Sequence, residues 1–154
     1  MKKRKASEKT FPIIIFGDEN MPGKDSSHES QNESPKNLTA LLVKPGMYPQ
    51  KITLKNDFAA MKKAVAAEHL EFTTPFAGDS VVLIAGELSK IDGSAANRSI
   101  KNGGKIVDVI CGNFLLVGDD INSGDFCSLT SEQLKNYETM FSLPRFSLIV
   151  TNNL

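Results

Sequence analysis

The sequence contains few of the residues on which small enzymes and membrane proteins most often depend. Its 154 residues include two cysteines, two histidines and no tryptophan. Eighteen basic residues balance eighteen acidic ones, so the net basic field typical of nucleic-acid-binding proteins is missing. No apolar run approaches the roughly 20 residues of a membrane-spanning helix, and the chain opens without a signal peptide. We therefore expect a cytoplasmic protein of one domain.

The shortage of histidine and cysteine also limits the chemistry that the chain can perform. A catalytic nucleophile needs a neighbouring base, but His28 lies in a polar stretch and His69 at the end of a predicted helix. Cys111 and Cys127 form no Cys-x-x-Cys pair, and we interpret them as reduced thiols because nothing local supports a dyad with His69. The acidic stretch 119–125 lacks the register of a calcium loop. We predict no enzyme activity, no catalytic residue, no metal site and no cofactor.

Residues 1–37 differ in composition from the rest of the chain. After the basic run Lys2–Lys5, most residues are polar or proline, and such a segment cannot bury enough apolar surface to order itself. The exception is Phe11–Phe16, where Pro12 limits a strand to an edge. We predict a polar, largely flexible tail with an edge strand or a partner-docking motif at 11–16, followed by a single domain over 38–154.

Apolar periodicity in this domain predicts five strands and two helices. The predicted strands cover residues 38–43, 50–55, 70–76, 80–85 and 106–117. The first helix begins at Asn56 or Asp57 and ends at Glu68, and Phe146–Val150 would suit a further edge strand. Most strands follow one another directly, and the first two are close enough to form a hairpin. We expect an α+β fold, with a single small antiparallel or mixed sheet of about five strands and two helices on one face.

The second helix has the clearest local signal in the chain. Thr130 and Gln133 have the spacing of a capping box, and Leu129 and Leu134 that of a hydrophobic staple. The long run 106–117 is ambiguous, because it contains a Gly-Asn pair. Gly112-Asn113 could form the turn of a tight hairpin, or the run could be one strand with a bulge at Gly112, which we favour.

Polar residues precede this run, and they are the candidate ligand site. The six candidate ligand-binding residues are Asn97, Arg98, Lys101, Gly103, Gly104 and Lys105. An arginine offers a planar fork for carboxylate or phosphate, and the glycine-lysine turn could add backbone donors and charge. The alternatives are structural: Arg98 would pair with Asp92 or Asp108, Asn97 would cap a turn, and the glycines would turn the chain into a strand.

Several of these blocks together resemble a known family of uncharacterised domains. The blocks are Val43–Gly46, Asn97-Arg98, Ile106–Gly118 and Ser128–Gln133, and the resemblance spans Leu38 to Phe141. The family is a domain of unknown function found in proteins of phages, plasmids and conjugative elements. The chain departs from its pattern at 94–96, where a proline-rich approach to Asn97 is replaced by Ser-Ala-Ala, and in its tail. The resemblance implies an accessory protein of a mobile element, and by association an anti-defence role, but no reaction.

Three functions follow, in decreasing order of support. The first is a non-enzymatic binding module that grips a host protein, or sequesters a small phosphorylated ligand at the six candidate residues, in the host cytoplasm. The second is a nucleic-acid-associated or antirestriction-type protein, which would use Lys2–Lys5 with Lys101 and Lys105; the balanced charge argues against it. The third is a small enzyme. The apolar runs 11–16 and 146–150 could also pair between two copies of the chain as exposed edges.

Overall fold

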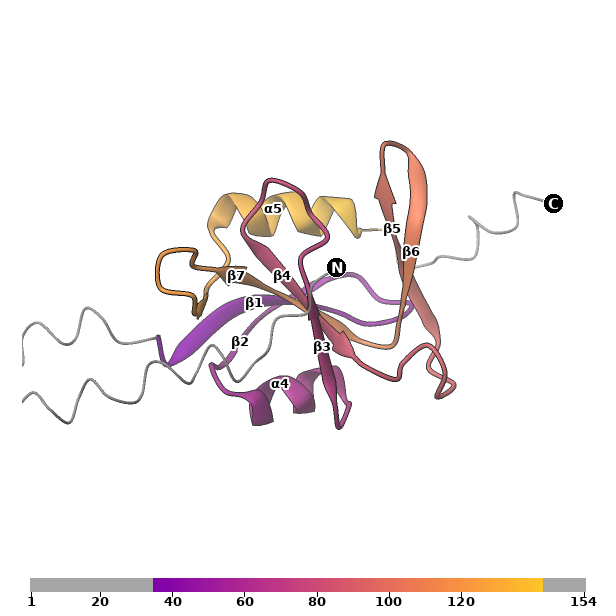
Figure 1. The fold of residues 1–154 in the computed structure, drawn as a ribbon, viewed down its shortest axis with the longest axis horizontal. Coiled ribbons are helices and arrows are strands. Elements are labelled where there is room, and N and C mark those ends of the chain that lie inside the picture. Colours follow the sequence, from indigo (N-terminus) through magenta and orange to yellow (C-terminus); the bar gives the residue numbers. More distant parts are fainter. Residues whose placement is uncertain (1–34, 143–154) are drawn as a thin grey trace, which may run out of the picture.

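The structure, a computed structural model, describes residues 35–142. Figure 1 shows a central sheet with a helix on each side and a two-stranded ribbon at one end. The elements in chain order are β1 (Asn37–Val43), β2 (Gln50–Lys55), α4 (Phe58–Val65), β3 (Leu70–Thr73), β4 (Val81–Gly86), β5 (Ala96–Asn102), β6 (Lys105–Cys111), β7 (Phe114–Asp119), β8 (Phe126–Cys127) and α5 (Ser131–Met140). No helix among the described residues has the length and apolarity needed to span a membrane.

The main sheet is antiparallel throughout. Its strand order is β2-β1-β7-β4-β3, and the short β8 pairs with β7. The predicted hairpin of the first two strands is confirmed, with Leu38 opposite Leu54 and Leu42 opposite Gln50. The expected α+β class is confirmed too, with the addition of a small second sheet made of β5 and β6.

The two helices do not share one face of the sheet, and that part of the prediction is wrong. Met61 and Val65 of α4 pack in one hydrophobic cluster, and Tyr137 and Phe141 of the α5 region pack in another. Figure 1 shows α4 and α5 on opposite sides of the sheet. The cause is that β1, β4 and β7 carry continuous apolar runs, whose successive side chains point to opposite faces. We call the two sides the α4 face and the α5 face.

Both helices begin where the sequence predicts. Asp57 caps α4 by accepting a hydrogen bond from the Ala60 N–H. At α5 the capping box is complete, since Thr130 and Gln133 each satisfy the other's backbone N–H. Helix α4 ends earlier than the predicted Glu68, because Ala66 adopts a left-handed conformation and closes the helix with bonds to the carbonyls of the last turn.

Gly112 is where the chain passes from the small sheet to the main one. Strand β6 pairs with β5, whereas β7 pairs with β1 and β4. The run 106–117 therefore forms two strands in two sheets, so the favoured single strand with a bulge at Gly112 is wrong, and so is the hairpin alternative. A positive φ of 79° at Gly112 makes this change of direction. Strand β5 was not predicted. The apolar runs 11–16 and 146–150 lie outside the described residues, so their assignment as edge strands stays a prediction.

Candidate functional site

Arg98 is a buried clamp between three parts of the chain. Its side chain is 3% exposed. The Nε and Nη2 groups donate to the Phe141 carbonyl at 3.0 and 2.9 Å, and Nη2 also donates to the Met47 carbonyl at 2.6 Å. Phe141 is the C-cap of α5, whose last turn has no basic residue of its own. Arg98 therefore supplies, from a distant strand, the cation that the negative end of a helix favours.

Asn97 completes the clamp. Its side-chain oxygen accepts from Nη1 of Arg98 at 2.7 Å, and its amide nitrogen donates to the carbonyls of Val43 and Gly112. Neighbouring residues of a regular strand point to opposite sides, yet Asn97 and Arg98 are both buried. The reason is a bulge, because the register of β5 on β6 shifts between Ala96 and Arg98 and leaves Asn97 as the extra residue.

The ion-pair alternative for Arg98 is also wrong. Asp92 accepts from Ser94, and Asp108 pairs with Lys90. Burial, without a neighbouring carboxylate, lowers the pKa of the Arg98 guanidinium from its usual value, although an arginine remains charged at neutral pH. Every nitrogen of the guanidinium donates to an oxygen of the protein itself.

The six candidate residues are not gathered into one pocket. Asn97 and Arg98 lie buried at the base of the β5–β6 ribbon, while Lys101 and Lys105 are exposed beside its turn. Gly103 and Gly104 form that turn with positive φ angles and open space around both. The two glycines thus have the conformation of a tight hairpin turn. Arg98 lies in the protein interior, whereas the two lysines lie in solvent.

The outer half of the ribbon exposes apolar side chains. Ile106 is 42% and Val107 59% exposed. A second register shift in the ribbon, between Ile100 and Lys101, makes Val107 an extra residue, so that both it and its neighbour face solvent. Figure 1 shows the ribbon extending beyond the main sheet at one end of the domain. Its base is held in the core by Ile100 and Ile110.

A cleft lies at the foot of the ribbon. It holds about 80 Å³ between β6, the edge strand β3, its neighbour β4, and the turn that follows β4. Its lining residues include Glu71, Leu83, Glu87, Ser89, Lys90, Asp108 and Cys111. Sequence reasoning did not single out Glu71, Ser89 or Lys90, because they come together only through the placement of β6 against β3 and β4.

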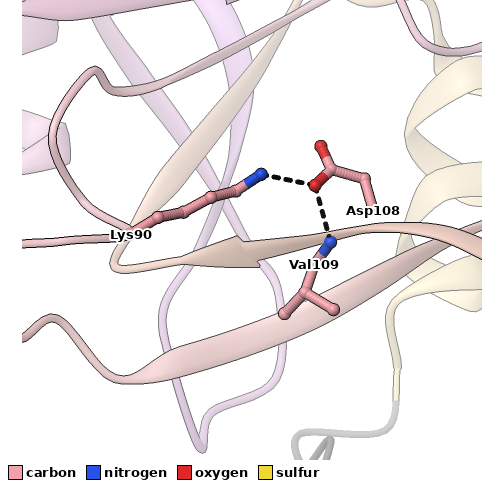
Figure 2. A network of polar contacts seen from close by, with 3 residues as sticks. All are labelled: Lys90, Asp108 and Val109. Atoms are coloured by element: carbon pink, nitrogen blue, oxygen red, sulfur yellow. Dashed lines mark hydrogen bonds and ion pairs between the residues drawn. The ribbon is translucent and has the colours of Figure 1, made fainter.

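One ion pair joins the two sides of this cleft. Lys90 Nζ lies 2.5 Å from the Asp108 carboxylate, whose same oxygen accepts the Val109 N–H (Figure 2). The bond to Asp108 raises the pKa of the Lys90 ammonium, with a smaller contribution from Glu71, while burial opposes the change. Both side chains are more than one-third exposed, so the pair contributes little to stability.

A second polar cluster lies between α5 and the start of β4. The Tyr137 hydroxyl donates to Asp79 at 2.5 Å, and Gln133 donates to the other carboxylate oxygen at 2.9 Å. The Tyr137 bond, followed by the Gln133 and Ser80 bonds, lowers the pKa of Asp79. Burial and the carboxylate together raise the pKa of Tyr137. These groups satisfy one another, and their role is to hold α5 on the sheet.

Within residues 35–142, no three histidine, cysteine or carboxylate side chains are grouped as metal ligands would be. Residues 38–142 match the family described as Domain of unknown function (DUF3846), and the chain belongs to that family. No curated protein and no solved structure matches the chain. The matched residues include those of the clamp, the ribbon and the cleft.

Proposed function

We propose that the chain is a non-enzymatic binding module that serves a phage or another mobile element by binding a host protein, and so counters a host defence system. The mobile-element setting depends on the resemblance described above. The protein partner is supported by the ribbon, which presents Ile106 and Val107 to solvent on a base packed into the core. β-Branched residues on a projecting ribbon offer apolar contact area that the fold itself does not use.

A partner strand could also pair with the ribbon. Among the described residues, β5 and β6 pair only with each other, so each has one edge without a neighbouring strand. Strand addition to such an edge gives affinity through backbone hydrogen bonds and specificity through alternate side chains. In this arrangement the bulge at Val107 would interrupt pairing on β6 and fix the register of the partner.

Sequestration of a phosphorylated signal has weaker support. The guanidinium of Arg98, which would be the main phosphate donor, is buried and already bound to the carbonyls of Met47 and Phe141. The remaining cations of the six candidate residues are Lys101 and Lys105 at an exposed turn. A nucleotide would therefore find two solvated lysines and no enclosed pocket at that turn.

The test compares the ribbon with a matched exposed isoleucine elsewhere. Ile121 is 74% exposed and lies in the loop between β7 and β8, at the other end of the domain (Figure 1). Immobilised wild type, Ile106→Asp and Ile121→Asp would be exposed to lysate of a phage-infected or plasmid-bearing host, and each retained protein would be purified and its affinity measured. We expect Ile106→Asp to weaken the affinity for the partner by about tenfold or more, and Ile121→Asp to keep the wild-type affinity.

Equal affinity of the two variants would contradict a ribbon-borne interface. A thermal shift with cyclic nucleotides or ADP-ribose derivatives would instead favour sequestration of a phosphorylated signal. Salt-sensitive retention of DNA would favour the nucleic-acid alternative. Turnover of any of these compounds would contradict the non-enzymatic assignment.

A further inference from the structure

The described part of the chain ends beside the β5–β6 ribbon. Its last residue, Ser142, directly follows Phe141, whose carbonyl accepts two hydrogen bonds from Arg98 of β5. The backbone of Met47 lies at the same place, because its carbonyl accepts from Nη2 of Arg98 as well. Figure 1 shows the end of α5 next to β5. The chain therefore enters its C-terminal residues 143–154 from the base of β5.

Exposed apolar side chains lie around this exit point. Met47 and Tyr48, in the loop between β1 and β2, are both exposed, and so is Met140 in the last turn of α5. Exposed apolar residues that share one surface mark a site of interaction more often than scattered ones do. The base of the ribbon thus has apolar surface that the packing of residues 35–142 leaves uncovered.

Strand β5 adds backbone hydrogen-bonding groups to this surface. Among the described residues it pairs with β6 alone. Strand β6 lies on the side of β3 and β4, with which it lines the cleft. The free edge of β5 therefore lies on the other side, where Asn97 donates to Val43 at the end of β1. An unpaired edge of this kind is a template for a further strand.

The segment Phe146–Val150 is the strand-forming run best placed to fill this edge. Three residues, Leu143–Arg145, connect it to Ser142, and they span up to roughly 10 Å, about twice the roughly 4.8 Å between neighbouring strands. The other apolar run, Phe11–Phe16, precedes β1 by twenty residues, 17–36, and β1 begins at the end of the domain opposite the ribbon (Figure 1). Loop closure therefore favours the C-terminal segment.

We infer that Phe146–Val150 adds to the free edge of β5 as a third strand of the small sheet. The short connector starts at the base, so the segment runs from there toward the turn of the ribbon. Phe146 then covers Met47 and Met140, and Leu148 and Val150 continue the same face. The inference goes beyond the proposed function and does not depend on it, because the edge of β6 with Ile106 and Val107 stays available to a partner.

The experiment measures amide exchange of the full-length chain by NMR. In an antiparallel ribbon alternate amides of β5 bond to β6, and the others point to the free edge. We expect the free-edge amides of residues 99–102 to exchange at least about tenfold more slowly in wild type than in the double variant Leu148→Pro/Ile149→Pro, which removes one N–H on each side of the segment. The matched control Asn152→Pro/Asn153→Pro lies beyond the segment and should keep the wild-type rates.

A second measurement on wild type alone locates the segment. Nuclear Overhauser contacts are expected between the Phe146 ring and the methyl groups of Met47 and Met140. Equal exchange in wild type and both double variants would overturn the inference and leave the edge of β5 to a partner protein. Protection that rises with protein concentration, together with a larger mass in sedimentation, would overturn it in favour of a second copy. Contacts from Phe11 or Phe16 in place of Phe146 would also overturn it. Failure to capture a host protein would leave every one of these results unchanged.

Discussion

The α4 face and the α5 face of the main sheet are equally well filled but chemically different. Each buries eleven hydrophobic residues in one cluster. The two most deeply buried polar side chains, Asn97 and Arg98, belong to the α5 side, as do the Asp79–Tyr137 bond and the cleft. A face closed by a single helix needs only apolar contacts, whereas a face shared by a helix and a ribbon needs polar groups to fix their relative positions.

The strongest test of whether both faces are hydrophobic cores is to truncate one buried leucine on each face. Leu115 and Leu116 are neighbours on β7, both are fully buried, and they belong to opposite clusters. We expect Leu115→Ala and Leu116→Ala each to lower the free energy of unfolding by about 3 kcal/mol or more, as measured by urea denaturation. If only one face were a true core, one of the two variants would lose less than about 0.5 kcal/mol.

The second prediction concerns the clamp. Arg98→Met leaves the buried carbonyls of Met47 and Phe141 without donors, and we expect a loss of about 2–4 kcal/mol in unfolding free energy. Lys101→Met, three residues along the same strand and exposed, should change it by less than about 0.5 kcal/mol. Urea denaturation of both variants tests this. Near-wild-type stability of Arg98→Met would show that the arginine is reserved for a ligand after all.

The third prediction concerns the pH dependence of the Asp79–Tyr137 bond, which holds α5 on the sheet. Because Asp79 has a lowered pKa in the folded protein, its contribution to stability is present above the unfolded-state pKa of about 4 and is lost as the pH falls through the folded-state value. Tyr137→Phe removes the largest cause of this shift and should cost about 1–2 kcal/mol at pH 7. Unfolding at pH 7 and pH 3 should show a smaller acid loss in the variant than in wild type. Equal losses would contradict the assignment.

The smallest expected effect is at the cleft. A double-mutant cycle with Lys90→Ala and Asp108→Ala should give a coupling energy of at most about 1 kcal/mol, because both side chains are partly exposed. Thermal unfolding of the four proteins measures it. A coupling of about 3 kcal/mol would mean that the pair is a structural element of the domain.

Local signals in the sequence predicted the hairpin and both helix starts. The capping box at Thr130 and Gln133 requires only residues three positions apart, and the β1–β2 hairpin requires only a short loop. The placement of the helices was predicted wrongly, although a signal was present: the unbroken apolar runs of β4 and β7 are typical of strands buried on both faces. Strands with one solvated face would instead have alternated apolar and polar residues.

The clamp and the cleft could not be predicted by such means. Strand β5 has the polar sequence ANRSIKN, and its bulge at Asn97 breaks the alternation on which strand prediction depends. Arg98 finds its partners 43 and 51 positions away, and Lys90 finds Asp108 18 positions away. These pairings are set by the change of sheet at Gly112, a tertiary event with no local pattern beyond a glycine.

The division between an apolar α4 face and an α5 side that polar groups fix is tested most directly by native-state amide hydrogen exchange of the full chain. Wild type and Arg98→Met would be compared residue by residue. The predicted result is a larger loss of protection in α5 and in the β5–β6 ribbon of the variant than in α4. A loss of protection centred on α4, or one that spares α5 and the ribbon, would contradict the division.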